Sequence, residues 1–162
     1  MEAIKELYKK DLILESDAKT KEEVLQEVGD YLYGEGLVKE SFSEAIIERE
    51  GDYPTGIDLA PIAEGLPNVA IPHTDTEHCD SKAIVFVKLK KAVTFNNMIK
   101  PEEELPVSYL FMIVNDQKTN QTNVLSELMG FMTNEDNMHE LDALDSKEEI
   151  YEFLVNNKRS EE

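Results

Sequence analysis

The chain of 162 residues has a single cysteine, Cys79, and no apolar run that approaches the length of a membrane span. One cysteine excludes a disulfide within the chain and fits a reducing compartment. The first residues, MEAIKE, also lack the pattern of a secretory signal peptide. We therefore expect a cytoplasmic protein that does not insert into a membrane.

Basic residues are also few, with 16 Lys and Arg against 35 Asp and Glu and a formal net charge of −19. Nucleic acids are bound through Lys and Arg, so this composition argues against a nucleic-acid partner. The negative charge would steer a basic protein partner onto the surface, although solubility alone explains the charge equally well. Two common signatures, a Gly-rich phosphate loop and a G-x-S-x-G nucleophile elbow, are absent.

The remaining composition is that of an ordinary globular protein, with 41% hydrophobic and 31% charged residues. The length suits one domain with a sizeable core, and the sequence shows no internal repeat and no interdomain linker. We therefore expect a single domain over residues 1–162.

Helical patterns lie towards both ends of the chain. Three capping boxes, at Thr20–Glu23, Ser41–Glu44 and Ser146–Glu149, each precede apolar residues at helical spacing. A further helix is expected from Gln121, which begins a face that apolar residues continue. The polar residues 134–137 are expected to break that helix.

Strand patterns occupy the middle of the chain. Leu12–Leu14 predicts a short edge strand, and Val69–Ile71 predicts a short buried one. The continuous apolar run Ala83–Val87 is typical of a central strand, with a second short extended piece at Val93–Phe95. The strongest strand pattern is Val107–Val114, which is rich in branched and aromatic residues. Helices on both sides of a block of strands predict an α/β sandwich.

The stretch around which the chain is organised is residues 68–75, NVAIPHTD. Pro72 cannot donate to a strand ladder, so the strand should stop there and His73 should stand on a loop at the strand end. In α/β sheets such loops gather ligands and chemistry. Histidine titrates near neutrality, and its free nitrogen attacks phosphorus or carbonyl centres. The alternative is a loop histidine with no role.

Arg49 is the second candidate site residue. The apolar face formed by Phe42, Ala45 and Ile46 reaches Arg49 at its next position. One interpretation is an arginine that extends from the helix end into solvent. The other is a guanidinium delivered to a partly buried anion site, where it can hold a phosphoryl group through two hydrogen bonds.

A metal site is a weaker interpretation. His73, His78 and Cys79 are metal-ligating residue types, but their spacing lacks the second cluster that a zinc site usually has. We prefer surface-loop residues for this group. His139 stands alone near the end of a helical pattern and is interpreted as structural or solvated.

These residues together resemble a known family, the enzyme IIA domains of the bacterial sugar phosphotransferase system, in the fructose–mannitol superfamily. The resemblance covers about residues 8–155. Within the family, the chain looks most like the galactitol-type members. The segments that carry the resemblance are Arg49-Glu50, Tyr53–Gly56, Val69–Asp75 with His78, Val93–Phe95, the strand Val107–Val114, Leu125 with Leu128, and Glu148–Ile150.

The resemblance implies a mixed sheet flanked by helices and a phosphotransferase activity. It implies that His73 accepts a phosphoryl group from phosphorylated HPr and passes it to a cysteine or histidine of an enzyme IIB component. It further implies that Arg49 steadies the phosphoryl group and that a membrane IIC component binds the sugar. No metal or organic cofactor is required, since such transfer needs positioning and charge neutralisation.

One departure from the family lies at Gln121. Many members carry a second histidine there that faces the active one, and glutamine keeps the hydrogen-bonding ability but not the charge. We expect Gln121 to form a second wall of the site, where slower transfer or greater reliance on Arg49 would follow; the alternative is a glutamine that caps the helix or faces solvent. Two alternatives remain: a regulatory module in which another protein reads the phosphorylation state of His73, and a plain interaction domain in which His73 is inert.

Overall fold

The centre of the molecule is a mixed sheet of five strands. The computed structural model describes residues 4–117 and 121–156. The strand order is β1-β4-β5-β3-β2; β1 runs parallel to β4 and β3 parallel to β5, while β4–β5 and β2–β3 are antiparallel. This arrangement confirms the α/β fold with a mixed sheet flanked by helices. The strands are β1 (Tyr8–Ser16), β2 (Gly56–Ile57), β3 (Asn68–Ala70), β4 (Ala83–Asn96) and β5 (Glu104–Val114).

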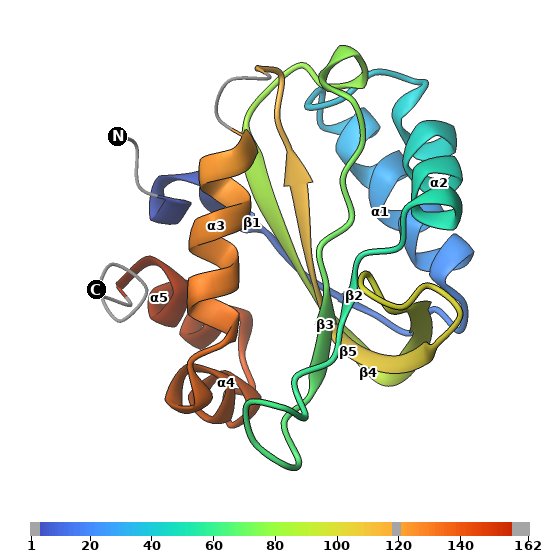
Figure 1. Ribbon diagram of the computed structural model, residues 1–162. Helices are drawn as coiled ribbons and strands as arrows, with labels where there is room; N and C mark the ends of the chain where they lie inside the picture. The colour runs from blue at the N-terminus through green and yellow to red at the C-terminus, as the bar shows by residue number, and fades with distance from the viewer. Residues whose placement is uncertain (1–3, 118–120, 157–162) are drawn as a thin grey trace.

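Helices cover both faces of this sheet (Figure 1). One face carries α1 and α2, and the other carries α3, α4 and α5. The helices are α1 (Lys21–Gly34), α2 (Phe42–Asp52), α3 (Gln121–Met132), α4 (Glu135–Asp142) and α5 (Lys147–Asn156), with short 3-10 turns η1 (Ile4–Leu7) and η2 (Thr76–His78).

Strand β4 shows why the sheet is buried on both sides. Val85 and Val87 pack in the core under α1 and α2, whereas Ile84 and Phe86 pack in the core under α3–α5. Successive side chains of a strand point to opposite faces, so a run that is apolar at every position needs cover on both. The run Ala83–Val87 was therefore correctly interpreted as a central strand.

The sequence divides β4 into two pieces that the structure joins. Ala83–Val87 and Val93–Phe95 belong to one strand of 14 residues, whose register with β5 shifts between Lys88 and Val93. The exposed pair Lys90 and Lys91 lies in that irregular part, where polar side chains interrupt the apolar pattern without ending the strand.

Two of the three capping boxes are confirmed and one is wrong. Thr20 accepts a hydrogen bond from the Glu23 backbone N–H at 3.1 Å. Ser146 and Glu149 cap α5 reciprocally through each other's backbone N–H groups. Ser41 makes no cap bond to α2; its Oγ lies 2.8 Å from His78 Nδ1 instead. The Ser41 hydroxyl thus bonds to a residue far away in the sequence and makes no bond to the backbone of the helix that follows it.

The polar segment 134–137 does end α3, but it also starts a helix that the sequence pattern did not predict. Asn134 caps α4 by accepting from the Asn137 backbone N–H at 3.0 Å. Only Met138 and Leu141 supply large buried apolar side chains to this helix, too few for a clear helical pattern.

Within residues 4–117 and 121–156, no helix combines the length and the apolar composition that a membrane crossing would need.

Candidate functional site

The backbone before His73 is fixed from both sides. Strand β3 ends at Ala70, and the Ile71 N–H then donates to the Thr55 carbonyl at 3.3 Å. The next carbonyl, that of Pro72, accepts from the Ile113 N–H at 3.0 Å. These bonds come from segments on either side of β3, so His73 follows a rigid strand end as the sequence predicts.

The side chain of His73 is half-buried, and its hydrogen bond determines which nitrogen is reactive. His73 Nδ1 lies 2.8 Å from the Ile71 carbonyl oxygen. A carbonyl oxygen only accepts, so Nδ1 must carry the hydrogen. In the neutral imidazole this leaves the lone pair on Nε2.

The electrostatic surroundings favour that neutral imidazole. Burial lowers the pKa of His73 below its usual 6.5 because the charged ring loses solvation. The Ile71 carbonyl raises this pKa, the positive charge of Arg49 lowers it, and the Asp75 carboxylate raises it. Since burial has the largest effect, the net shift of the pKa is downward, which favours the neutral imidazole.

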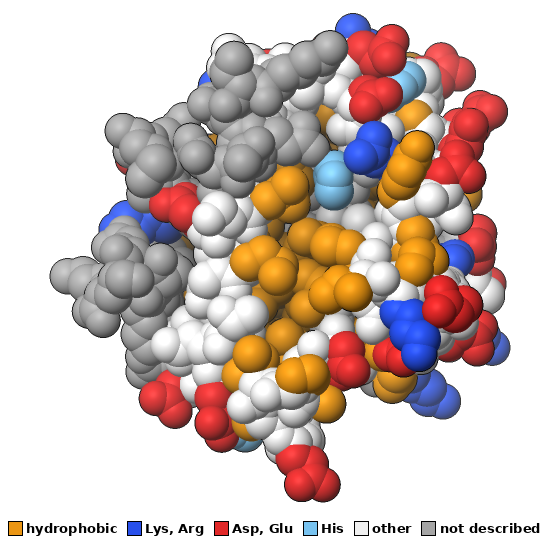
Figure 2. Space-filling view, in the orientation of Figure 1, with side chains coloured by type: hydrophobic (Ala, Val, Ile, Leu, Met, Phe, Trp, Pro, Cys, Tyr) orange, Lys and Arg blue, Asp and Glu red, His pale blue; other side chains and the backbone are white. Residues whose placement is uncertain are grey.

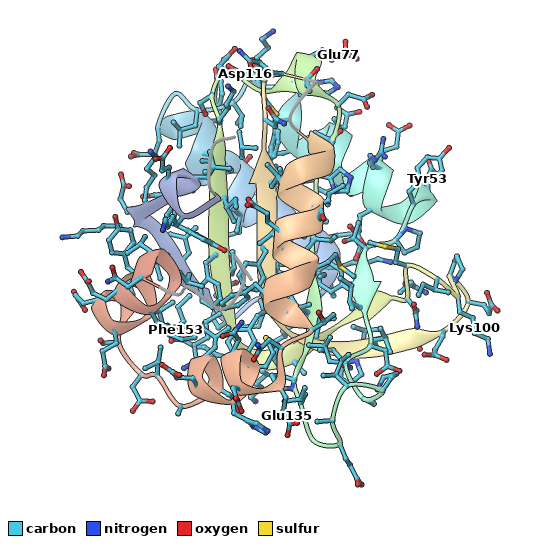
Figure 3. The ribbon with its side chains drawn as sticks, turned by 60° about the vertical axis from the view of Figure 1, so that its left-hand side comes forward. Tyr53, Glu77, Lys100, Asp116, Glu135 and Phe153 are labelled. Carbon is cyan, nitrogen blue, oxygen red and sulfur yellow. The ribbon has the colours of Figure 1, made fainter. Side chains whose placement is uncertain are left out.

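Arg49 occupies the last turn of α2, close enough to affect the pKa of His73. Its guanidinium lies over the Tyr53 ring, 5.1 Å from the ring centroid, and its Nη1 is 3.5 Å from Asp75 Oδ1. Tyr53 itself projects outward beyond the end of α2 (Figure 3). Among the described residues, no partner accepts a hydrogen bond from the buried Nε of Arg49. A buried donor of this kind is suited to an anion.

Glu50, the residue after Arg49, is a buried carboxylate that the sequence analysis did not single out. Its side chain is 2% exposed and accepts from the Thr55 N–H at 2.7 Å and from the Thr55 hydroxyl at 2.8 Å. Burial raises the pKa of Glu50 to about 7, although the Thr55 bonds and the charge of Lys21 oppose this shift. Glu50 lies four residues after Ile46 on the buried face of α2, and that spacing was the signal available in the sequence.

The other candidate residues differ in what the structure shows of them. Gln121 begins α3, but its side chain lies outside the described residues, so its place at the site stays a prediction. His78 bonds to Ser41, and Cys79 is buried. His139 pairs with Glu135 on the exposed side of α4, at 3.2 Å. In the part of the chain that the structure describes, no three His, Cys, Asp or Glu side chains gather closely enough to hold a metal ion.

The surface around the site is largely apolar. Figure 2 shows hydrophobic side chains gathered over the middle of this face, between α3 and α2, beside a histidine and a basic side chain. Half-exposed apolar residues that pack against the core under α3–α5 include Ile57 from β2, Ala63 from the following loop, and Leu125 and Met129 from α3. An exposed apolar surface of this kind is typical of a protein–protein contact.

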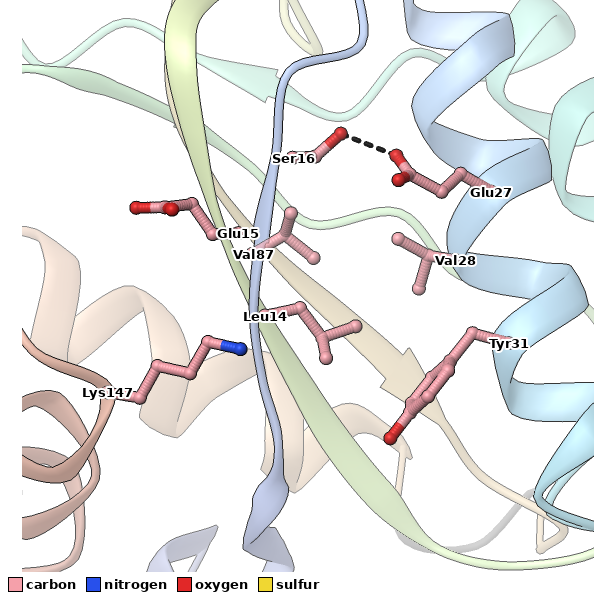
Figure 4. A pocket seen from close by; sticks show the side chains of 8 residues that line it. All are labelled: Leu14, Glu15, Ser16, Glu27, Val28, Tyr31, Val87 and Lys147. Carbon is pink, nitrogen blue, oxygen red and sulfur yellow. Dashed lines mark hydrogen bonds between the residues drawn. The ribbon is translucent and has the colours of Figure 1, made fainter.

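A separate cavity of about 180 Å³ lies along the edge strand β1, between α1 and α5 (Figure 4). Its lining contains neither His73 nor Arg49, and the Ser16 hydroxyl donates to Glu27 within it. The lining residues are Leu14, Glu15, Ser16, Glu27, Val28, Tyr31, Val87 and Lys147. This cavity therefore takes no part in the chemistry at His73.

A mixed sheet between two helical layers, with a neutral histidine beside an arginine at a strand end, defines a small α/β protein suited to carrying an anionic group. The family model described as "Phosphoenolpyruvate-dependent sugar phosphotransferase system, EIIA 2" matches residues 6–157. The chain belongs to this family and is a phosphotransferase component of the IIA type, which confirms the resemblance seen in the sequence.

Known relatives agree with this assignment. The galactitol-specific EIIA component of Escherichia coli strain K12 is 30% identical over 108 residues, which cover 67% of this chain and 68% of that protein. A solved complex of the E. coli mannitol enzyme IIA with phosphorylated enzyme IIB shares the fold, with a TM-score of 0.69, 21% identity, and 90% and 94% of the two chains covered. The nitrogen regulatory protein IIA-Ntr from Neisseria meningitidis shares it too, with a TM-score of 0.69, 23% identity, and 93% and 98% covered.

Proposed function

We propose that His73 is the phosphocarrier residue, taking a phosphoryl group from phosphorylated HPr and passing it to an enzyme IIB component. The observation that carries this proposal is the bond between His73 Nδ1 and the Ile71 carbonyl, because it leaves Nε2 as the free nucleophile. The Nε2 lone pair attacks phosphorus while the bond from phosphorus to the donor nitrogen breaks. In the second transfer the Nε2–P bond breaks as the IIB nucleophile attacks.

Arg49 holds the phosphoryl group in this proposal. The buried Nε–H, which has no acceptor among the described residues, and the Nη groups can donate to phosphoryl oxygens once Arg49 leaves Asp75. The long 3.5 Å contact to Asp75 gives little resistance to that movement. Gln121 is proposed to donate an amide hydrogen bond from the start of α3, where the positive end of the helix dipole also favours an anion.

The partner and substrate follow from the relatives in this proposal. The apolar side of the molecule around His73 would receive both HPr and the IIB component in the cytoplasm. Similarity to the galactitol-specific component supports a sugar or polyol of that type, bound by the membrane IIC component. A regulatory role is the second candidate, and the uncharged Gln121 in place of a histidine is the observation that favours it. The IIA-Ntr fold likeness shows that the fold itself does not separate the two roles.

The test is phosphotransfer from labelled phosphoenolpyruvate through purified enzyme I and HPr. Wild type, His78→Ala and His139→Ala should become labelled, and His73→Ala should not. Chase of the label onto a IIB protein would favour transport, whereas a stable label that IIB does not remove would favour regulation. Undiminished labelling of His73→Ala would falsify the assignment of His73.

A further inference from the structure

A continuous series of hydrogen bonds runs from the end of α2 to the imidazole of His73. The Glu50 carboxylate accepts two bonds from Thr55, at 2.7 and 2.8 Å. The Thr55 carbonyl accepts from the Ile71 N–H at 3.3 Å, and the Ile71 carbonyl lies 2.8 Å from His73 Nδ1. Each residue of this series is therefore hydrogen-bonded to the next, and the series begins at the buried carboxylate of Glu50.

We propose that Glu50 is a positioning residue for His73: through Thr55 and the backbone of Ile71, it fixes the carbonyl that keeps the hydrogen on Nδ1 and leaves Nε2 free. This inference rests on the proposed function of His73. Glu50 does not touch the phosphoryl group, and its effect is exerted through the geometry of the strand end.

The buried charge itself argues for this role. Glu50 continues the buried face of Phe42 and Ile46, where an apolar side chain would complete the core of α2. A buried carboxylate is unfavourable unless its oxygens are hydrogen-bonded, and here both oxygens are used for Thr55 alone. The carboxylate is therefore placed to hold the turn before β2 and adds no apolar contact to the core.

The turn that Glu50 holds has little freedom to move elsewhere. Pro54 has no N–H to donate, and the Thr55 N–H is taken by Glu50. At the next residue, Gly56, an added Cβ would lie 2.5 Å from the Asn96 carbonyl oxygen. The turn is thus packed between α2 and the end of β4, and Thr55 is the residue in it that bonds both to Glu50 and to Ile71.

Ionisation of Glu50 gives this role a measurable signature. The carboxylate can accept from both Thr55 donors, whereas the neutral acid must use one oxygen as a donor. The pKa of Glu50, raised by burial to about 7, places this change within the working pH range. Lys21 at the start of α1 is the charged group whose field lowers this pKa. Arg49, its neighbour on α2, is directed to Asp75 and Tyr53 instead.

The first test is the tautomer of His73 in the unphosphorylated protein, read from the imidazole ¹⁵N chemical shifts. The variants are Glu50→Gln and, as a matched control, Glu48→Gln, which removes the same charge from an exposed position of the same helix. In Glu50→Gln one of the two oxygens that accept from Thr55 is replaced by an NH2 group, which can only donate. Wild type and Glu48→Gln should show hydrogen on Nδ1, and Glu50→Gln should show a mixture of tautomers. Unchanged His73 shifts in Glu50→Gln would overturn the proposal.

The second test is the pH dependence of phosphorylation by phosphorylated HPr. Wild type and Glu48→Gln should show a rise in rate near pH 7 in addition to the titration of His73 at lower pH. Glu50→Gln should lack that rise and be roughly tenfold slower above pH 7, as expected for about one lost hydrogen bond. A Glu50→Gln profile identical to that of wild type would contradict the proposal.

Thr55 provides a second pair of variants should Glu50→Gln fail to fold. Thr55→Ser keeps the hydroxyl that donates to Glu50, and Thr55→Val removes it at nearly the same volume. Ser should restore the wild-type tautomer and rate, and Val should resemble Glu50→Gln; equal behaviour of the two contradicts the proposal. If wild-type His73 takes no label at all, the proposed function fails, while the tautomer comparison still decides the role of Glu50.

Discussion

The two faces of the sheet are built from different chemistry. Under α1 and α2 the core is mostly aliphatic, and α2 carries on this side both Arg49, whose charge lowers the pKa of His73, and the buried Glu50. Under α3, α4 and α5 the core contains a chain of rings whose centroids lie 5.3–6.0 Å apart. These rings belong to Tyr109, Phe86, Phe111, Phe131 and Phe153.

This difference separates chemistry from stability. Ring pairs at such distances add about 0.5–1.5 kcal/mol each beyond their buried area. The polar group among them is paired, since the Tyr109 hydroxyl donates to Asp142 at 2.6 Å. The α2 side instead holds a buried carboxylate and an arginine Nε for which the described residues provide no acceptor. Substitutions on the aromatic side should therefore change stability, and those on the α2 side should change transfer.

The largest effect is expected from Phe111→Ala. Phe111 is fully buried and contacts the rings of both Phe86 and Phe131, so its removal leaves a cavity and should lower the free energy of unfolding by about 3–5 kcal/mol. Chemical denaturation measures this loss. The half-exposed Phe153, at the end of the ring chain, serves as control, and Phe153→Ala should lose less than half as much. If a folded Phe111→Ala protein transferred the phosphoryl group much more slowly, the aromatic side would affect transfer as well as stability, and the proposed separation of the two sides would be wrong.

The next effect is the pH dependence of stability caused by Glu50. Its pKa is raised from 4.5 to about 7, so the folded protein binds this proton more tightly than the unfolded chain. The contribution of Glu50 to the free energy of unfolding should therefore fall as pH rises from 4.5 to 7, by up to about 3 kcal/mol, and be constant outside that window.

Denaturation of wild type and Glu50→Gln across that window isolates this contribution, because the amide does not titrate. Relative to wild type, Glu50→Gln should gain stability with rising pH even though it transfers more slowly. Parallel curves for the two proteins would show that Glu50 does not titrate there. The expected result would strengthen the contrast between the two faces of the sheet. Glu50, on the α2 side, would then lower the stability of the protein at pH values where its carboxylate is charged.

Arg49→Lys should affect transfer alone. Lysine keeps the charge but loses the planar fork and the Nε–H, so phosphoryl transfer from HPr should slow by about 10- to 100-fold, equivalent to roughly 1.5–3 kcal/mol. The melting temperature should be unchanged, because the replaced Nε–H is a buried donor that no described residue accepts from. An unfolded variant, or an unchanged rate, would make Arg49 a structural residue.

The smallest effect is expected at Gln121, the one candidate on the aromatic side. Gln121→Ala should slow transfer by less than about tenfold, as for a neutral hydrogen bond. Gln121→His should add a pH dependence near the usual histidine pKa of about 6.5. Rates and phosphohistidine lifetimes at several pH values measure both. If both variants match wild type at every pH, the chemistry belongs to the α2 side alone.

The position of His73 was predictable and its orientation was not. Pro72 lacks an N–H, so the sequence itself ends β3 before His73. The carbonyl of Ile71 is held through Thr55, and that of Pro72 by Ile113, and these pairings join residues that are 16 and 41 positions apart. No local pattern contains them.

The same reasoning explains the error at Ser41 and the omission of Glu50. A serine three residues before a glutamate predicts a cap, yet His78, 37 residues later, bonds to the Ser41 hydroxyl instead. Glu50 followed Ile46 at helical spacing, but a charged residue is ordinarily assigned to the exposed side. Its partner, Thr55, lies only five residues away and was within reach of the sequence analysis.

The bond between Pro72 and Ile113 makes the geometry before His73 depend on a strand that is synthesised later. Strand β3 has three residues and pairs in parallel with β5, which the ribosome makes about 40 residues later. Until β5 has emerged, neither the strand end nor the imidazole has its final geometry. If His73 has the proposed role, a nascent chain that already contains His73, Arg49 and Glu50 would therefore be a poor phosphoryl acceptor until β5 has paired with β3.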